Sequence, residues 1–317
     1  MRILVTGGLG FIGHNVVRQL EQLGHEVSIV NSITNYGVIP YAELFRLRDE
    51  RLSRIKTRTI HQADICDNTI DSFIERCKPE IVIHLASVPN QKMVNSDPTL
   101  AAKTMTEGLV NMCEQSCKHQ VKRFVYISSS MVYGDFKDDI KEDARCSPKG
   151  LYAILKLAGE RLVEDYGRRG CFEHTIIRPS AVYGPRDIKD RVISKFLCAA
   201  MLGEVITVNG SDECLDFSYV DDVASGIVGA SLSDATAGKT YNITRGQSRS
   251  LLEAAELAVR IAGKGKIEVG DRDKNFPQRG TLNIDAARTD FGFNPKIDLE
   301  EGLQRYYAYL KNNSLRS

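Results

Sequence analysis

The sequence predicts an α/β fold in which a doubly wound parallel sheet carries helices on both faces. Short runs of consecutive apolar residues alternate with helical patterns through residues 1–178, and a strand buried on both faces needs such an unbroken run. A glycine-rich turn joins the first run to the first helical pattern. The chain has 317 residues, 42% of them hydrophobic, which is enough for a sizeable core in one or two domains.

The predicted elements follow one another in a regular order. The pattern predicts strands at residues 3–5, 27–30, 59–61, 81–85, 124–127 and 175–178. It predicts helices at residues 13–23, 70–77, 100–117 and 152–166. A charged segment at residues 36–58 is interpreted as a helical insertion on the solvated surface. After residue 178 the alternation becomes less regular, with turn signals at 183–185 and 209–211.

Composition argues against several classes of protein. The 42 Lys and Arg residues against 41 Asp and Glu leave a net charge of +1, too small a surplus for a nucleic-acid partner. No apolar run approaches the ~20 residues that span a bilayer, and the glycine turn begins too early for a signal peptide. We therefore expect a cytoplasmic protein without a membrane partner. The eight cysteines form no C-x-x-C pair and the six histidines no metal-binding spacing, so we expect reduced thiols and no metal.

The glycine-rich turn has the spacing of a phosphate cradle. Gly7, Gly10 and Gly13 fit T-G-x-x-G-x-x-G, and Gly8 with the last two also fits G-x-G-x-x-G. Glycines permit a tight turn and let the backbone approach a pyrophosphate, whose charge then rests on the helix N-terminus. The motif is weak alone, but its place between a strand and a helix predicts a dinucleotide site.

Two polar residues are placed for the adenosine half of a dinucleotide. Asn31 follows the second strand, where an acidic residue usually binds the ribose hydroxyls, and its amide can still accept a hydrogen bond. No Arg or Lys follows it, which favours NAD over NADP. Asp64 is placed either to bind the adenine amino group or to cap a turn. We therefore expect residues 1–177 to form an NAD-binding Rossmann domain. Residues 178–317 are expected to form mostly a smaller substrate-binding lobe, with some segments returning to the main sheet.

A tyrosine and a lysine share one face of a predicted helix. Tyr152 and Lys156 have the i,i+4 spacing of Y-x-x-x-K. A lysine cation and a positively charged nicotinamide favour the phenolate, so we expect a lowered tyrosine pKa. The phenolate can take a proton from a substrate hydroxyl as hydride leaves its carbon. The serine run 128–130 follows the 124–127 strand, where a hydroxyl can stabilise developing oxygen charge.

Together these residues resemble the extended short-chain dehydrogenase/reductase superfamily, specifically its NAD-dependent nucleotide-sugar epimerase/dehydratase branch. The resemblance covers nearly the whole chain. It includes H-L-A-S at 84–87, V-Y-G at 132–134, R-P-S-A-V-Y-G-P at 178–185, D-F-S-Y-V-D-D at 216–222 and G-F-N-P at 292–295. Several ordered motifs at the family's spacing make the resemblance specific.

The resemblance implies that NAD transiently oxidises C4 of a nucleotide-diphosphate sugar and that the ketone is reduced again on its other face. The catalytic residues that it implies are Ser129 (with Ser130 as second choice), Tyr152 and Lys156. The implied cofactor-binding residues are Gly7, Gly10, Phe11, Ile12, Gly13, Asn31, Asp64, Ile65, Leu85, Ala86, Tyr152 and Lys156. The implied substrate-binding residues are Ser87, Ser129, Ser130, Ala181, Arg191 and Arg279.

The substrate end departs from the branch's pattern. The asparagine common before V-Y-G-P is Ala181 here, and the diphosphate-binding arginine common before D-F-x-Y-V is Leu215. Arg279, with Arg191 as second choice, could supply the missing charge, although each could equally be a surface arginine.

Three functions remain open at this point, with a 4-epimerase favoured. Standard 4,6-dehydration needs an Asp and a Glu after the catalytic serine, and this chain has Ser130 and Met131 there. A nucleotide-sugar dehydrogenase or reductase with net hydride transfer is the main alternative, and a non-catalytic NAD-binding regulator is a third.

The resemblance also implies a homodimer through the 100–117 and 152–166 helices. The apolar stripe of the second helix is equally typical of burial in its own subunit; it consists of Leu155, Ala158, Leu162 and Val163.

Overall fold

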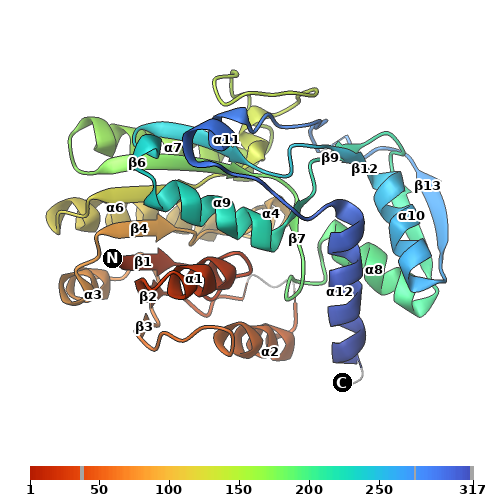
Figure 1. Cartoon of the computed structure of the whole chain (residues 1–317), viewed down its shortest axis with the longest axis horizontal. Helices are drawn as coiled ribbons and strands as arrows, with labels where there is room; N and C mark the ends of the chain where they lie inside the picture. Colours follow the sequence, from red (N-terminus) through yellow and green to blue (C-terminus); the bar gives the residue numbers. More distant parts are fainter. Residues whose placement is uncertain (36–38, 275, 315–317) are drawn as a thin grey trace.

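A seven-stranded parallel sheet forms the centre of the computed structural model, which describes residues 1–35, 39–274 and 276–314 (Figure 1). The strand order is β11-β6-β5-β4-β1-β2-β3, and every neighbouring pair is parallel. The strands are β1 (Arg2–Thr6), β2 (Glu26–Val30), β3 (Ile60–His61), β4 (Ile81–His84), β5 (Arg123–Ile127), β6 (Glu173–Pro179) and β11 (Lys239–Ile243).

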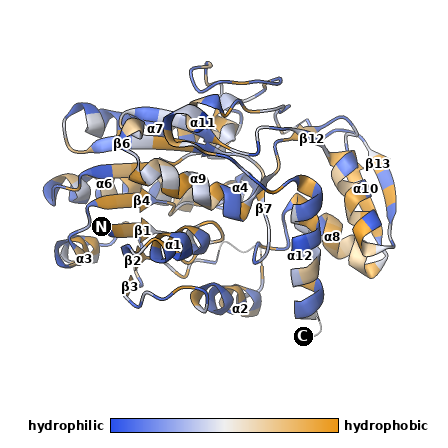
Figure 2. Ribbon diagram, in the orientation of Figure 1, coloured by the Kyte–Doolittle hydropathy of each residue, from blue (hydrophilic) through white to orange (hydrophobic). Residues whose placement is uncertain are grey.

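Helices cover both faces of this sheet, which explains why its strands are apolar at consecutive positions. One face carries α1 (Gly13–Gln22), α9 (Val220–Leu232) and α11 (Asp285–Phe291), and the other carries α3 (Thr69–Cys77), α6 (Gly108–Lys118) and α7 (Leu151–Arg168). Along β1, Ile3 and Val5 pack into the first of these cores, while Leu4 packs into the second. Figure 2 shows β1 and β4 in the orange of apolar residues, whereas α12 carries both colours. The predicted doubly wound α/β fold is confirmed.

The structure refines several predicted elements. The predicted 100–117 helix is a continuous helical stretch of three parts: α5 (Pro98–Ala102), a π-helical turn (Lys103–Glu107) and α6. A short helix that the sequence did not predict, α4 (Gln91–Ser96), precedes it. The charged insertion contains α2 (Tyr41–Leu52), while its residues 36–38 lie outside the described residues.

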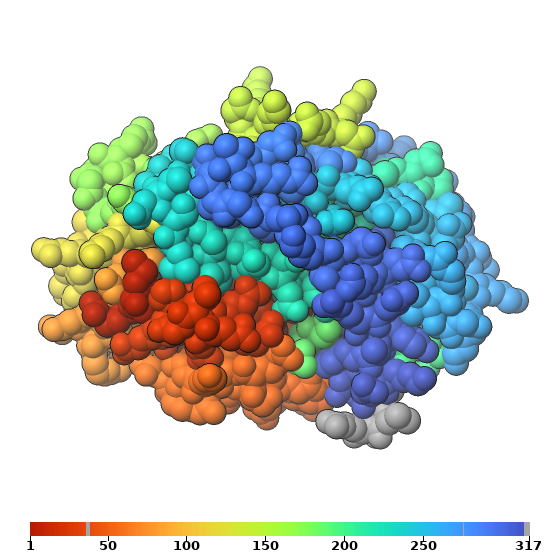
Figure 3. Space-filling view, viewed as in Figure 1, coloured from red at the N-terminus to blue at the C-terminus, as the bar shows by residue number. Residues whose placement is uncertain are grey.

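A second, smaller core lies beside the carboxyl edge of the sheet. It packs α8 (Val192–Leu202), α10 (Leu251–Ala262) and α12 (Leu299–Ser314) against a parallel pair of strands, β8 (Val205–Asn209) and β13 (Lys266–Gly270). Two further strand pairs adjoin it: β7 (Val182–Tyr183) with β10 (Ser218–Tyr219), and β9 (Cys214–Leu215) with β12 (Arg249–Ser250). The C-terminal helix α12, in dark blue, also reaches α2 (Figure 3), where the Tyr309 hydroxyl donates to Glu50 at 2.5 Å.

The second half of the chain does not stay in this smaller core. Between β10 and β12 it returns to the main sheet, where α9 packs on α1 and β11 pairs with β6. It returns again with α11, which packs against β11 and α9. The chain therefore contributes to both parts of the molecule after residue 178.

One cysteine pair contradicts the expectation of reduced thiols. Cys117 ends α6 and Cys171 lies in the turn after α7, and the two form a disulfide with their Cα atoms 4.7 Å apart. The pair is 54 residues apart in sequence, so no local spacing could reveal it. The free cysteines of the described residues are Cys66, Cys77, Cys113, Cys146, Cys198 and Cys214.

Among the helices that the structure describes, none is long and apolar enough to cross a lipid bilayer.

Candidate active site

The glycine turn closes tightly at the end of β1. Gly7 has a φ of +68°, its N–H donates to the Val30 carbonyl at 2.8 Å, and its own carbonyl accepts from the Gly10 N–H at 2.8 Å. A Cβ at position 13 would lie 2.2 Å from the Gly7 carbonyl oxygen, and a Cβ at position 10 would lie 2.9 Å from it. Only glycine lets the turn fold back onto the start of α1 in this way.

The start of α1 is chemically suited to an anion. Ile12 is its N-cap, no side chain caps it, and its first turn contains no acidic residue. The His14 and Asn15 N–H groups donate to the Gly10 and Ile12 carbonyls, both at 3.1 Å, but the positive end of the helix dipole still favours a negative ligand here. The glycine cradle and the uncapped helix together fit the pyrophosphate of a dinucleotide.

Gly13→Ala is expected to weaken NAD binding by about tenfold or more, that is ~1.4 kcal/mol or more, because the new methyl group displaces the turn. Titration of the cofactor-free protein with NAD measures this. Gly24→Ala is the control for a general loss of stability: Gly24 lies just beyond the other end of α1 with a φ of +81°, so alanine is strained there, but its added Cβ meets nothing within 4 Å. Equal NAD affinities for the Gly13 variant and the unchanged protein would refute the cradle.

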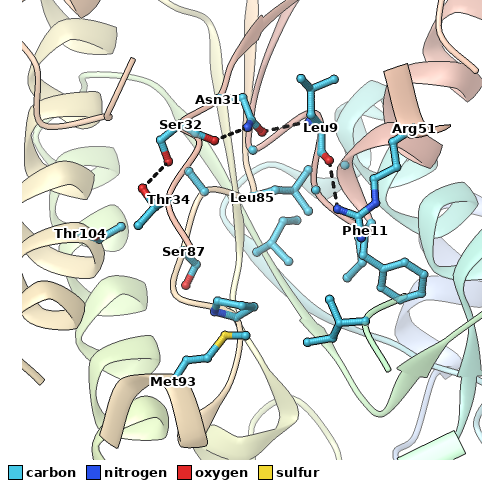
Figure 4. A pocket seen from close by; sticks show the side chains of 18 of the residues that line it. Leu9, Phe11, Asn31, Ser32, Thr34, Arg51, Leu85, Ser87, Met93 and Thr104 are labelled. Carbon is cyan, nitrogen blue, oxygen red and sulfur yellow. Dashed lines mark hydrogen bonds between the residues drawn. The ribbon is translucent and has the colours of Figure 1, made fainter. Parts of the chain in front are cut away.

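Asn31 lines the cleft but is already engaged. Its Oδ1 accepts from the Leu9 N–H at 3.1 Å, and its amide donates to the Ser32 carbonyl at 2.5 Å, as the dashed lines in Figure 4 show. This amide therefore fastens the glycine turn to the end of β2. Asp64 also lines the cleft, where its Oδ1 accepts from the Cys66 N–H at 2.9 Å. One of its oxygens thus serves the local turn, which is the alternative that the sequence left open.

The three expected catalytic side chains line the same cleft. Ser129 follows β5 and caps a 3₁₀ turn (Ser130–Tyr133), because its Oγ accepts from the Met131 N–H at 3.2 Å. Tyr152 lies in the first turn of α7 and Lys156 one turn later, where its Nζ donates to the Ile127 carbonyl at 2.8 Å. Helix α7 thus brings both groups to the carboxyl end of β5.

Burial shifts the pKa values of Tyr152 and Lys156. Burial raises the pKa of Tyr152 above its ordinary value, and the charge of Arg191 and a hydrogen bond with Ser129 offset this only in part. The lowered pKa that we expected includes the charge of the nicotinamide, so for the complex with NAD it stays a prediction. Burial also lowers the pKa of Lys156 to about 7, although the carboxylate of Glu160 acts to raise it.

A buried ion pair lies directly behind the catalytic group. Glu160 is fully buried, and the Arg178 guanidinium donates to its two oxygens at 2.9 and 2.7 Å. The Ser128 hydroxyl donates to the same carboxylate at 2.5 Å. Arg178 also donates to the Tyr133 hydroxyl at 2.9 Å, and Tyr133 donates to Asn242 at 2.8 Å. The network ties β5, α7 and β6 together at the level of the serine run.

The structure brings together most of the expected site residues but not all of them. The cleft encloses about 340 Å³ and is lined by all twelve expected cofactor-binding residues and by Ser87, Ser129, Ala181 and Arg191. Ser130 is buried beneath the cleft, and neither it nor Arg279 is among the described residues that line it. Arg279 lies near Glu213 instead, and burial lowers its pKa to about 10. The roles of Ser130 and Arg279 in substrate binding therefore stay predictions that the lining of this cleft does not support.

The charged residues of the cleft that the sequence analysis missed include Arg51 and Asp187. Arg51 of α2 donates to the Leu9 carbonyl at 3.3 Å and to the Arg186 carbonyl at 2.7 Å. Asp187 is buried and forms an ion pair with Arg191 at 3.2 Å. Both residues stand in charged segments that look like solvated surface. The one available signal was the position of Asp187 directly after the Y-G-P-R turn.

The fold and the cleft define an enzyme that binds a dinucleotide at the carboxyl edge of a parallel sheet. The chain belongs to the NAD dependent epimerase/dehydratase family, whose model matches residues 3–244. Its cofactor is therefore NAD, and the predicted family resemblance is confirmed.

Relatives of the chain are named for more than one reaction. A putative UDP-glucose 4-epimerase of Methanocaldococcus jannaschii is 30% identical, over 98% of this chain and 99% of its own. The dTDP-glucose 4,6-dehydratase of Streptomyces niveus is 27% identical, over 99% of this chain and 94% of its own. The crystal structure of UDP-glucuronic acid 4-epimerase from Bacillus cereus, in complex with UDP-glucuronic acid and NAD, superposes with a TM-score of 0.88 at 25% identity. That superposition covers 99% of this chain and all of the other.

Proposed function

We propose that this enzyme is a nucleotide-sugar 4-epimerase that oxidises the C4 hydroxyl transiently. The observation that carries the proposal is the convergence of Ser129, Tyr152 and Lys156 on one cleft with the glycine cradle. Two of the three relatives described above are named as 4-epimerases of UDP-sugars, which supports a uridine diphosphate sugar as substrate.

The mechanism assigns one role to each side chain. The Tyr152 oxygen takes the proton of the C4 hydroxyl, and the C–H electron pair leaves as hydride, which turns the alcohol into a ketone. NAD held by the glycine cradle would supply the hydride acceptor, and the same hydride would be returned to C4 on the opposite face of the ketone. Ser129 donates a hydrogen bond to the C4 oxygen and stabilises its developing charge. The proton then returns from Tyr152, so the sugar is inverted at C4 without net oxidation.

The positive charge of Lys156 supports the phenolate. Burial removes part of this charge: with burial lowering the pKa and Glu160 raising it, the net pKa of Lys156 is about 7, so the ammonium is only partly protonated at neutral pH. Glu160 counteracts this loss, because it is the charged group that acts to raise the pKa of Lys156. The buried network behind the site thus keeps a cation available to the tyrosine.

Dehydration is disfavoured by the residues beside Ser129. Removal of the C5 proton and of a hydroxyl group requires acid–base side chains. Ser130 and Met131 are both buried, and neither can act as a carboxylic acid at the sugar. The same-family dehydratase relative therefore indicates common ancestry of the fold more than a shared reaction.

The nucleotide released from the purified protein separates epimerase from dehydrogenase. An enzyme that recycles its hydride internally is expected to release about one NAD⁺ per chain on denaturation, measured by absorbance and mass. Mostly NADH would indicate an oxidation that awaits a second acceptor. An empty protein would favour the dehydrogenase or reductase, which exchanges its cofactor, and released NADP would contradict the assignment of Asn31.

Arg191 is our candidate for the substrate's diphosphate. It lines the cleft, whereas Arg279 does not.

We also propose a cytoplasmic homodimer that pairs α6 and α7. Leu155 and Val163 are buried in the subunit's own cores, but Ile154 on α7 is 49% exposed and offers apolar surface to a partner.

A further inference from the structure

Asp187 is a buried carboxylate that the mechanism above does not use. It lies between β7 and α8, on the segment that leads from the main sheet into the smaller core, and it lines the cleft. Only 5% of the residue is exposed. A carboxylate so deeply buried is costly unless its oxygens are satisfied.

The two oxygens of Asp187 have different surroundings. Oδ1 accepts from the Ile188 N–H at 2.8 Å and forms the ion pair with the Arg191 Nε at 3.2 Å. Oδ2 has no hydrogen-bond partner in the part of the chain that the structure describes. Burial raises the pKa of Asp187 to about 6, and the charges of Arg191 and Arg51 oppose this rise. The carboxylate is therefore ionised at neutral pH, with one acceptor oxygen left for a ligand of the cleft.

The position of Asp187 narrows the identity of that ligand. Arg51 connects this region to the glycine turn through the Leu9 carbonyl. On the other side of Asp187, its ion-pair partner Arg191 lines the same cleft as Tyr152, and the charge of Arg191 acts to lower the pKa of that tyrosine. Asp187 therefore lies between the phosphate cradle and the catalytic tyrosine. A ligand that runs from the cradle to the tyrosine carries sugar hydroxyl groups between these points, as NAD does with its nicotinamide ribose.

We propose that the free oxygen of Asp187 accepts a hydrogen bond from a sugar hydroxyl of the bound ligands, and so helps to select them. The hydroxyl belongs either to the hexose of the substrate or to the nicotinamide ribose of the cofactor. An ionised carboxylate is an acceptor only and forms strong bonds to such donors. If the hydroxyl belongs to the hexose, the proposal rests on the proposed function. If it belongs to the nicotinamide ribose, the proposal requires only that NAD binds.

The test compares Asp187→Ala with the unchanged enzyme by calorimetric titration. The NAD-loaded protein is titrated with UDP-glucose and with UDP, and the cofactor-free protein with NAD. Loss of a hydrogen bond to a charged acceptor costs roughly 1.5–3 kcal/mol, or about 10- to 100-fold in affinity. If the hexose is the partner, this loss appears for UDP-glucose but not for UDP. If the ribose is the partner, the loss appears for NAD.

Two further variants test whether the loss comes from misfolding or from removing any carboxylate of this segment. Asp187→Asn keeps an acceptor oxygen and nearly the same shape, so its loss should be smaller, and it serves if the alanine variant fails to fold. Asp190→Asn is the matched control, because Asp190 lies on the same segment but pairs with Lys92 and Lys195 outside the cleft. It should change none of the affinities.

The outcomes are distinguishable from failure of the proposed function. If the unchanged enzyme binds NAD but no UDP-sugar, the proposed substrate is wrong and the NAD titration alone decides the role of Asp187. If folded Asp187→Ala binds UDP-glucose and NAD within about twofold of the unchanged enzyme, the proposal is overturned. An equal loss for UDP and UDP-glucose with an unchanged affinity for NAD would also overturn it, since the contact would then involve neither the hexose nor the nicotinamide ribose.

Discussion

Tyr152→Phe is expected to lower kcat for C4 epimerisation by ~10³-fold while leaving NAD bound. Removing the phenolic oxygen takes away the group that accepts and returns the C4 proton, and such proton transfer contributes about 10²- to 10⁴-fold. The ring itself remains, so the cleft keeps its shape. Turnover of UDP-glucose and the NAD content of the purified variant are the two measurements.

Tyr166→Phe provides the matched control for this substitution. Tyr166 lies on the same helix α7, but its hydroxyl donates to Glu114 and it does not line the cleft. Its loss should leave kcat nearly unchanged. Undiminished epimerisation by Tyr152→Phe would remove the tyrosine from the mechanism, and loss of NAD from that variant would indicate a binding role instead.

Glu160→Ala is expected to destabilise the fold by about 3–5 kcal/mol, the effect of removing one partner from a buried ion pair. The Arg178 guanidinium, only 4% exposed, would keep its charge without the carboxylate that now receives two of its hydrogen bonds. The Ser128 hydroxyl would lose its acceptor as well. Urea unfolding followed by circular dichroism measures the free-energy difference.

The double variant Glu160→Met/Arg178→Met separates the ion pair from simple packing. Apolar side chains of similar volume leave no buried charge, so this variant should unfold closer to the unchanged protein than Glu160→Ala does. Equal stability of Glu160→Ala and the unchanged protein would show that Arg178 finds other partners. In either variant the catalytic lysine loses its anionic neighbour, so the activity should fall at neutral pH.

The sheet was predictable because its strands are unbroken runs of apolar residues, which is the pattern of strands buried on both faces. Consecutive apolar residues such as Ile3 and Leu4 point to opposite faces, and each face has its own core. The arrangement after residue 178 was harder, because β11 joins the main sheet from a distant part of the chain. Which strand pairs with which is decided by tertiary packing, and no local pattern records it. The disulfide between Cys117 and Cys171 was missed for the same reason.

Some residues of the site were predictable from local sequence and others were not. Ser129, Tyr152 and Lys156 were predictable because the end of a parallel strand and one helix face fix their positions. Ser130 is one residue further along the chain, but it is buried and is not among the described residues that line the cleft, and the sequence could not separate the two serines in this way. Arg279 and Asp187 show the remaining difficulty. A charged residue in a polar segment gives no sign in the sequence of whether it is buried or which cleft it faces.

The return of β11 to the sheet limits how this enzyme can be taken apart. A fragment that stops after residue 177 would lack the strand that covers β6, and an unpaired edge of that kind invites aggregation. The smaller core is in turn assembled from separate stretches of the chain, in α8, α10 and α12. Specificity therefore cannot be exchanged between relatives by joining two gene halves. A working chimaera would need several short grafts, each ending where the chain crosses from one core to the other.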